Sequence, residues 1–290
     1  MADSDPSMIL ATLRGDPVIG RLVGELRAEP PGQARIFRTR LLASGAPCIL
    51  KLADELEAIW MPAISARASD IVAEVLAHGV LTELERPWLL LADLPHRGRS
   101  DRHDIARDVM RAAARFQQEA TELELATYPI DADFMITYAQ QAIDAGCPGP
   151  ASDVLARIGT DEDWLRSLGG HLKGHGDVHF WNALAPTPDG PWRLIDPIPR
   201  TAHWAWDAGY AQLTSGLPET PDLIMLLTQE RQRLGLPVPG IEQFDRLRTV
   251  ILGWSALLWW AILPARREES WWRAEVERNV TALAVDLRTR

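Results

Sequence analysis

The N-terminal part of the chain has the hydrophobic pattern of β-strands. Apolar and polar residues alternate over residues 35–42, which is the period of a half-buried strand, and the turn sequence ASGAP leads to a second apolar run over residues 48–52. Together the two runs predict a β-hairpin. A third strand is predicted over residues 86–95, and the spacing of apolar residues over 69–81 favours a helix before it.

The rest of the chain has mainly the spacing of amphipathic helices. This spacing is found over residues 104–120, 133–146 and 152–168, and again from residue 206 to the C-terminus. Short strands are predicted near residues 182–185 and 192–195. The order of elements predicts an α+β fold with two lobes, a small β-rich lobe over residues 1–93 and a larger, mainly helical lobe over residues 94–290.

Composition and charge narrow the classes of function. The 290 residues carry a formal net charge of −10, which argues against a non-specific nucleic-acid binder, because such proteins need basic patches for phosphates. An acidic surface suits a cationic partner instead. The N-terminus lacks the pattern of a secretory signal, and the longest hydrophobic run, residues 250–265, is short for a membrane span. We therefore expect a cytoplasmic protein with no nucleic-acid or membrane partner.

The segment HGDVHFWNAL, residues 175–184, concentrates polar side chains that are costly to bury without partners. One interpretation is a zinc site, because His175, Asp177 and His179 alternate and would share one face of an extended strand. Zinc normally takes further nitrogen or sulfur ligands, however, and the remaining histidines are scattered along the chain. A second interpretation is an Asp-containing turn whose side chains satisfy local backbone groups.

A third interpretation, phosphoryl transfer, accounts for more of the sequence. Asp177 is followed by Asn182, a short strand, the turn PTPDG and a second strand that ends at Asp196. Phosphoryl transfer needs one carboxylate to accept the proton of the acceptor hydroxyl. It also needs an amide oxygen and a second carboxylate to hold Mg²⁺ against the nucleotide phosphates. The ends of two short neighbouring strands would bring all three groups to one edge, so we favour this interpretation.

The HGD segment and the residues that follow it resemble the aminoglycoside phosphotransferase family, which has the protein-kinase-like fold. The family's catalytic loop reads H-G-D-x-H-x-x-N, and HGDVHFWN matches it at every fixed position. PWRLIDPIP is similar to the metal-binding segment of the branch that phosphorylates streptomycin and hydroxyurea, an I-D-P core preceded by a tryptophan. The resemblance implies that Asp177 is the catalytic base and that Asn182 and Asp196 are Mg²⁺ ligands. It also implies that Asp207 supports the catalytic loop without being catalytic itself.

The resemblance also implies a phosphate-binding lysine in the small lobe. APCILKL is similar to the strand that carries this lysine in the family, which would be Lys51 here. Such a lysine needs a carboxylate partner from the following helix. We choose Glu74 as that partner, and Glu55 and Glu57 remain open because they lie closer in sequence.

The nucleotide implied by the resemblance is ATP, with GTP as the alternative. The loop EPPGQA would cover it, with Gly32 as the least hindered residue. Adenine would bond to the backbone around Ala92 to Leu94. No Walker motif is present, so the P-loop route to ATP is closed.

The acceptor is expected to be a cationic or polyhydroxylated small molecule, with an aminoglycoside-like antibiotic as the first choice. An aminoglycoside would need acidic side chains around an open cleft in the helical lobe. The candidates are Asp131, Asp133, Asp161, Glu162, Asp163, Glu268 and Glu269. Trp181 and Trp204 flank the catalytic segments and could line such a pocket. Ile198 stands where the streptomycin branch usually has a basic residue, and this departure points to a different acceptor.

Two alternatives to the aminoglycoside interpretation remain. The first keeps the chemistry and changes the acceptor to a sugar, an amino alcohol, a hydroxyurea-like compound or another antibiotic. The second is a nucleotide-binding pseudokinase, which the intact Asp177, Asn182 and Asp196 argue against. The sequence does not indicate the oligomeric state.

Overall fold

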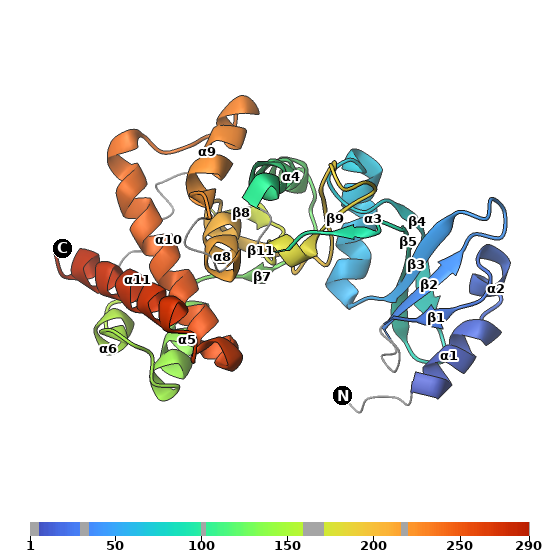
Figure 1. Cartoon of the computed structure of the whole chain (residues 1–290), viewed down its shortest axis with the longest axis horizontal. Coiled ribbons are helices and arrows are strands. Elements are labelled where there is room, and N and C mark those ends of the chain that lie inside the picture. The colour runs from blue at the N-terminus through green and yellow to red at the C-terminus, as the bar shows by residue number, and fades with distance from the viewer. Residues whose placement is uncertain (1–5, 30–34, 100–102, 159–170, 216–219, 290) are drawn as a thin grey trace. The chain divides into compact units, whose positions relative to one another are not determined.

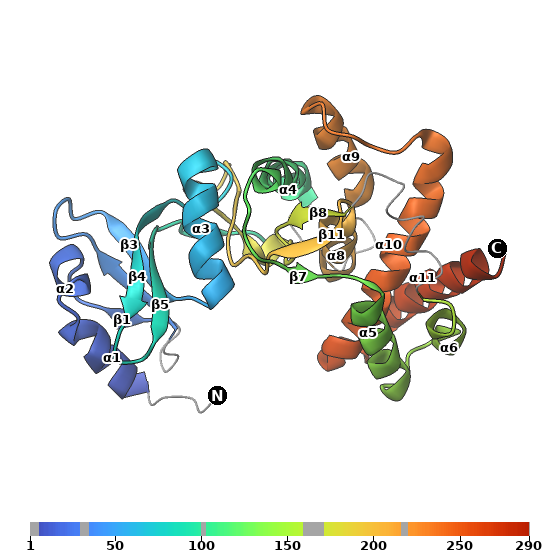
Figure 2. The same ribbon diagram turned by 180° about the vertical axis from the view of Figure 1, so that it is seen from behind.

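The computed structural model describes residues 6–29, 35–99, 103–158, 171–215 and 220–289. The chain divides into two compact units (Figures 1 and 2). The first, here the N-unit, is formed by Met1–His96 and Leu184–Asp196. The second, the C-unit, is formed by Arg97–Ala183 and Pro197–Arg290. The mixed α+β architecture predicted from the hydrophobic pattern is confirmed, while the predicted lobe boundary between residues 93 and 94 stays a prediction.

The N-unit is built on a five-stranded sheet with the strand order β1-β2-β3-β5-β4. Its strands are β1 (Arg27–Ala28), β2 (Ile36–Arg40), β3 (Pro47–Leu52), β4 (Val75–Leu81) and β5 (Arg86–Ala92). All neighbouring pairs are antiparallel. The hairpin and the third strand predicted from the sequence are therefore confirmed as β2–β3 and β5.

The alternation of side chains along β3 separates an apolar face from the face that carries Lys51. Leu50 and Leu52 are buried in a core that includes Ile9 and Leu13 of helix α1 (Pro6–Gly15), next to the short helix α2 (Ile19–Leu22). Lys51 points to the opposite face, which helix α3 (Glu55–Ala68) covers through its packing on β4 and β5. The lysine therefore faces α3.

The helix predicted over residues 69–81 is wrong. The helix that follows β3 is α3, which begins directly after Asp54, whose carboxylate caps it by accepting the backbone N–H of Glu57 at 2.8 Å. Residues 75–81 instead form β4, which is hydrogen-bonded to β5 with alternating exposure along its length. The apolar spacing of this segment fits both periods, and pairing with β5 decides in favour of the strand.

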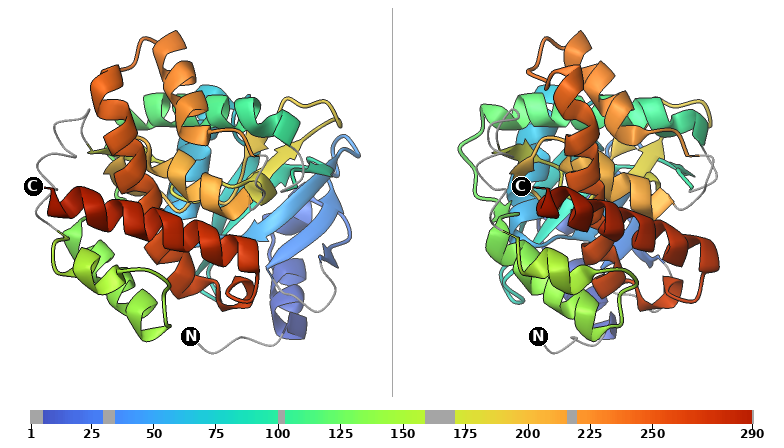
Figure 3. Two further views of the ribbon diagram at one scale, coloured as in Figure 1. Left: turned by 60° about the vertical axis from the view of Figure 1, so that its left-hand side comes forward. Right: turned by 90° about the vertical axis from the view of Figure 1, so that its left-hand side faces the viewer.

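The C-unit is mainly helical (Figure 3). Its α-helices among the described residues are α4 (Ala106–Thr121), α5 (Ala132–Asp144), α6 (Ala151–Leu155), α8 (Trp206–Ser215), α9 (Leu223–Arg233), α10 (Ile241–Ile262) and α11 (Ser270–Arg288). Short 3₁₀ helices are η1 (His103–Ile105), η2 (Phe180–Asn182) and η3 (Pro264–Arg266). The helices predicted near 104–120 and 133–146 and after residue 206 are confirmed.

The long hydrophobic run of the sequence forms α10, which is buried against α5, α8 and α11. The rings of Trp260 on α10 and Trp272 on α11 stack with their centroids 5.5 Å apart. Within the described part of the chain, no helix combines the length and the apolar character needed to cross a membrane.

The C-unit also contains a small three-stranded sheet, with the strand order β7-β11-β8. Its strands are β7 (Tyr128–Pro129), β11 (Arg200–His203) and β8 (His171–Gly174). Three further short strands are β6 (His96–Arg97), β9 (Ala183–Ala185) and β10 (Arg193–Leu194). The last two confirm the strands predicted near residues 182–185 and 192–195. Since β8 ends directly before His175, this sheet fixes where the HGD segment begins.

Candidate functional site

The loop that follows β8 makes a turn that only glycine permits at Gly176. This residue has φ of 79°, in the left-handed region that favours glycine. A Cβ atom there would lie 2.0 Å from the carbonyl oxygen of Ile198 and 2.4 Å from Cγ of Arg200. The loop therefore packs directly on the segment that leads into β11, which holds the next residue, Asp177, in place.

Asp207, at the start of α8, binds the backbone of this loop. Its carboxylate accepts the backbone N–H of Gly176 at 2.8 Å and that of His175 at 3.3 Å, and the side-chain amide of Gln117 at 3.2 Å. The side chain is buried, and burial raises the pKa of Asp207 to about 6. These contacts agree with the supporting role expected for Asp207.

The carboxylate of Asp177 is oriented by donors on both oxygens. The hydroxyl of Tyr210 donates to Oδ1 at 2.7 Å, and the amide Nδ2 of Asn182 donates to Oδ2 at 2.8 Å. His179 Nε2 lies 3.7 Å from the same Oδ2. Burial alone would raise the pKa of Asp177, but the contacts with His179 and Tyr210 outweigh it and hold the pKa below its usual value. Asp177 is therefore an ionised, fixed carboxylate.

The sequence analysis missed Tyr210 and Arg200 at this site. Tyr210 lies three residues after Asp207 on α8, so both face the loop of the HGD segment from the same side of the helix. This three-residue spacing could have indicated Tyr210 from the sequence. Arg200 begins β11, where it lies opposite Gly174 of β8, and no pattern in the sequence indicated this pairing.

In the N-unit, Lys51 lies between two carboxylates. Its Nζ is 2.6 Å from Oε1 of Glu57 and 2.6 Å from Oδ1 of Asp196. Burial alone would lower the pKa of Lys51, but Asp196 and Glu57 raise it above its usual value. Burial is also the main cause that raises the pKa of Glu57, to about 7, against the opposing effect of Lys51. The lysine is therefore a fixed cation.

Asp196 has an unusual backbone conformation. Its φ is 55°, in the left-handed region, where aspartate is tolerated at some cost. The side chain is 38% exposed, whereas that of Glu57 is 3% exposed. Asp196 therefore keeps an accessible carboxylate while it holds Lys51.

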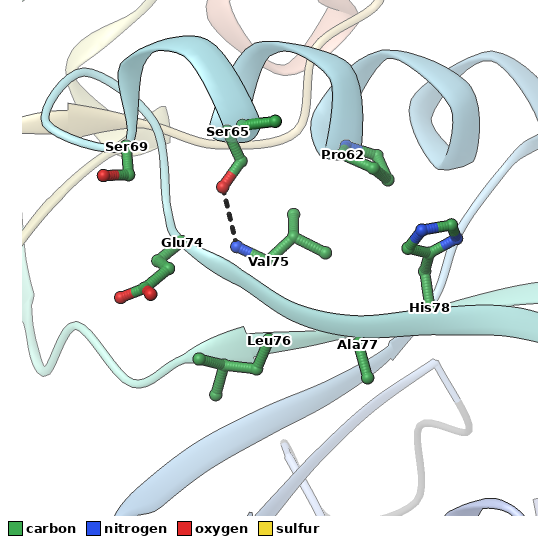
Figure 4. A pocket seen from close by; sticks show the side chains of 9 residues that line it. Pro62, Ser65, Ser69, Glu74, Val75, Leu76, Ala77 and His78 are labelled. Atoms are coloured by element: carbon green, nitrogen blue, oxygen red, sulfur yellow. Dashed lines mark hydrogen bonds between the residues drawn. The ribbon is translucent and has the colours of Figure 1, made fainter.

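The predicted pairing of Lys51 with Glu74 is wrong, because Glu57 is the partner. Glu57 lies on the first turn of α3, whose start faces the lysine, whereas Glu74 precedes the edge strand β4. Figure 4 shows Glu74 beside a surface pocket between α3 and β4, where the hydroxyl of Ser65 accepts the backbone N–H of Val75. Glu55 is not the partner either.

Of the other residues predicted to bind the nucleotide, the structure describes Ala92 and Leu94. The backbone N–H of Ala92, at the end of β5, is already bonded to the carbonyl oxygen of Glu74 at 2.9 Å. Leu94 follows β5 with a buried side chain. Gly32 lies outside the described residues, so its prediction stays as it was.

Some of the residues predicted to line an acceptor pocket have other contacts in the structure. Asp131 caps α5 by accepting the backbone N–H of Phe134, and Glu269 forms an ion pair with Arg266. Trp204 is fully buried, while Trp181 is 47% exposed. Asp133 lies in the first turn of α5. Asp161, Glu162 and Asp163 lie outside the described residues.

The predicted site residues thus fall into two sets. Asp177 and Asn182 are brought together in the C-unit, and Lys51 and Asp196 in the N-unit. Around the histidines of the HGD segment, as elsewhere in the described part of the chain, no three side chains of His, Cys, Asp or Glu gather as metal ligands do.

Comparison with known proteins identifies the fold. No family model matches the sequence, and no curated protein matches it significantly. Among solved structures, the chain is similar to a choline/ethanolamine kinase family protein from Mesorhizobium loti, with a TM-score of 0.62 and 13% identity over 99% of this chain and 96% of the other. It is also similar to choline kinase LicA from Streptococcus pneumoniae, with a TM-score of 0.59 and 13% identity over 96% and 98%.

A third similar structure is the aminoglycoside phosphotransferase APH(4)-Ia, with a TM-score of 0.53 and 12% identity over 94% of this chain and 99% of the other. Identities this low carry information on the fold alone. The expected kinase-like α+β architecture is confirmed, and the chain has the fold shared by choline kinases and aminoglycoside phosphotransferases.

Proposed function

We propose that the protein is an ATP-dependent phosphotransferase that transfers the γ-phosphate to a hydroxyl group of a small molecule. The observation that carries this proposal is the oriented carboxylate of Asp177, which accepts a hydrogen bond from Tyr210 on one oxygen and from Asn182 on the other. A positioned carboxylate can accept the proton of an acceptor hydroxyl as that hydroxyl attacks a phosphoryl group. Solved structures of the same fold are named as choline kinases and aminoglycoside phosphotransferases, which supports this class of reaction.

The N-unit supplies the groups proposed to bind the nucleotide. Lys51, held by Glu57, would contact its phosphates, and Asp196 offers an accessible carboxylate oxygen to a metal ion. In the C-unit, Asn182 uses its Nδ2 for Asp177, which leaves its oxygen as a ligand of the kind that Mg²⁺ prefers. When bound with the nucleotide, Mg²⁺ supplies positive charge against the phosphate oxygens. ATP is proposed, with GTP as the alternative.

The adenine contact is proposed for the backbone near Leu94. The N–H of Ala92 is engaged with Glu74, so a base would use the chain that follows β5. Gly32 remains the proposed residue of the covering loop.

The acceptor predicted from the sequence is an aminoglycoside-like antibiotic, within the streptomycin and hydroxyurea branch. The names of the similar structures support a broader set, because they include choline and ethanolamine kinases as well as an aminoglycoside phosphotransferase. We therefore propose a hydroxyl-bearing small molecule as the acceptor.

The role of Asp177 is tested by Asp177→Ala. The substitution should lower kcat by several orders of magnitude, because the base is lost, and should leave the affinity for nucleotide nearly unchanged. Turnover of labelled ATP with an antibiotic and metabolite panel measures the first effect, and calorimetric titration with MgATP the second. A variant that keeps more than about a tenth of the wild-type kcat on its acceptor contradicts the assignment.

A further inference from the structure

The side chain of Arg200 lies directly beside the catalytic loop. In the small sheet of the C-unit, Arg200 is opposite Gly174 of β8 and beside Tyr128 of β7. Its aliphatic stem packs on Gly176, where a Cβ would lie 2.4 Å from Cγ of Arg200. Asp177 and Tyr210 are both near enough to Arg200 to act on its guanidinium electrostatically.

The guanidinium of Arg200 is held by aromatic faces. Its Cζ lies 5.2 Å from the ring centroid of Tyr128 and 5.2 Å from that of Phe134. A cation over a ring face is attracted by the quadrupole of the ring, and this attraction does not consume the N–H donors in the guanidinium plane. Over the residues that the structure describes, these donors have no hydrogen bond or ion pair.

The more deeply buried Arg231 shows the difference. It also lies over an aromatic face, with Cζ 4.9 Å from the ring centroid of Trp204. Its donors, however, are bonded to Oε1 of Gln117 at 2.7 Å and to the carbonyl oxygen of Pro237 at 2.9 Å. Arg231 is therefore a satisfied structural cation, whereas Arg200 keeps a planar set of donors within electrostatic reach of Asp177.

The charge at this position bears on the acceptor. A cationic group brought close to the guanidinium of half-buried Arg200 would be repelled by its positive charge, which costs free energy at short range. A carboxylate or phosphate group would instead gain charge-assisted hydrogen bonds, in the bidentate geometry that guanidinium favours. The overall net charge of −10 does not alter this, because the nearest charges dominate once the site is partly desolvated.

We propose that the acceptor carries an anionic oxygen group, a carboxylate or a phosphate, close to the hydroxyl that is phosphorylated, and that Arg200 binds this group. The inference rests on the proposed phosphotransferase function and replaces the cationic acceptor expected from the sequence. Arg200 sets specificity, and Asp177 remains the base.

The test is a panel of matched acceptors assayed with MgATP. The anionic members are glycerate and gluconate for carboxylates and glycerol 3-phosphate for phosphates; their counterparts are glyceramide and glycerol, and the cationic members are choline, ethanolamine and kanamycin. We expect phosphorylation of an anionic member at a kcat/KM at least about tenfold above that of its neutral counterpart, from the usual gain of a hydrogen bond between charged groups. The carboxylate and phosphate arms identify which anion is bound.

Two substitutions at Arg200 connect this preference to the residue. Arg200→Gln should raise the KM for the anionic acceptor about 10- to 100-fold and leave the KM for MgATP within about twofold, while Arg200→Lys, which keeps the charge, should recover part of the loss. Arg278→Gln is the matched control, since it removes an exposed arginine of the same unit that pairs with Glu275. It should behave as wild type. Thermal unfolding of each variant verifies that it is folded.

The outcomes separate this inference from the function on which it rests. Phosphorylation of choline, ethanolamine or kanamycin in preference to the anionic members overturns the inference alone. So does an Arg200→Gln variant whose KM rises for MgATP and not for the acceptor, because the anion bound by Arg200 would then be the transferring phosphoryl group. If no member of this panel or of the wider antibiotic and metabolite panel is phosphorylated above the level of Asp177→Ala, the proposed function fails and the inference with it.

Discussion

The hydroxyl of Tyr210 donates a hydrogen bond of 2.7 Å to Oδ1 of Asp177, which connects helix α8 directly to the loop of the HGD segment. The same helix carries Asp207, whose carboxylate binds the backbone of that loop. One helix thus fixes both the backbone of the loop and the side chain that it presents. The ring of Tyr210 packs on that of Trp259 on α10, with the ring centroids 4.4 Å apart. The orientation of the carboxylate therefore depends on the packed helical core.

Tyr210→Phe tests this connection. The hydrogen bond from Tyr210 helps to keep the pKa of Asp177 low, so its removal should raise that pKa. Because the base must be ionised, the acidic limb of the kcat profile should move to higher pH. At neutral pH the carboxylate stays ionised, and kcat should fall about 3- to 10-fold because Tyr210 no longer orients it. The measurement is kcat as a function of pH with the acceptor identified by the panel.

Tyr138→Phe serves as the control for Tyr210→Phe. Tyr138 packs on Phe134 with ring centroids 4.6 Å apart in the same unit, and no hydrogen bond joins it to Asp177 in the described structure. This variant should keep the wild-type profile. A Tyr210→Phe enzyme with lower activity but an unmoved acidic limb would show that Tyr210 acts through packing alone.

The identity of the Lys51 partner can be tested by comparing two glutamates. Glu57→Gln removes a carboxyl partner 2.6 Å from Nζ of Lys51 and should weaken nucleotide binding about tenfold, because Asp196 is then the one carboxylate that holds the lysine. Glu74→Gln makes the same change beside β4, away from the lysine, and should bind as wild type. Calorimetric titration with MgATP measures both. Equal losses in the two variants would rule out a specific role for Glu57.

Asp196→Asn should weaken the binding of the magnesium–nucleotide complex, because a neutral amide replaces a charged ligand. Asparagine tolerates the left-handed backbone of this position, so the change isolates the charge from the conformation. Activity should recover in part at high Mg²⁺ concentration. Titration with nucleotide at several Mg²⁺ concentrations provides the measurement, and an affinity equal to that of the wild type would remove Asp196 from the metal ligands.

The close packing at Gly176 predicts an unequal effect of two glycine substitutions. Gly176→Ala should lower the free energy of unfolding by more than about 3 kcal/mol. The new Cβ would overlap the backbone of Ile198, and the alanine would have to adopt a positive φ. Gly146 has a similar φ of 70°, and a Cβ added there would have no heavy atom within 4 Å. Gly146→Ala should therefore lower the free energy of unfolding by about 1 kcal/mol. Urea denaturation of both variants, followed by tryptophan fluorescence, distinguishes them. Similar losses would mean that the loop moves freely away from Ile198.

Much of the fold could be predicted because the local pattern agrees with the final structure. The alternation in β2, the apolar run in β3 and the helical spacing in α4 and α5 each agree with the element that forms. The segment that became β4 satisfies both periods, and only its hydrogen bonds to β5 decide between them. Pairing of this kind joins residues that the local pattern does not connect.

The candidate site also contains residues that the local sequence could indicate and residues that it could not. Asp177 and Asn182 lie five positions apart in one motif, so the sequence could predict their contact, and the functional role of both remains a proposal. Glu57 was left open because choosing between glutamates requires knowing which helix follows β3 and where it begins. Arg200 was missed because its neighbours, Tyr128 and Phe134, come from a segment more than sixty residues earlier in the chain.

The return of residues 184–196 to the N-unit has a consequence for protein engineering. Because Asp196 is supplied by this second segment, a fragment that ends near His96 would contain Lys51 and Glu57 but not the carboxylate that completes their cluster. Exchange of the N-unit between related proteins would therefore require two grafted pieces with three junctions. A single-crossover chimaera would combine Lys51 from one parent with Asp196 from the other.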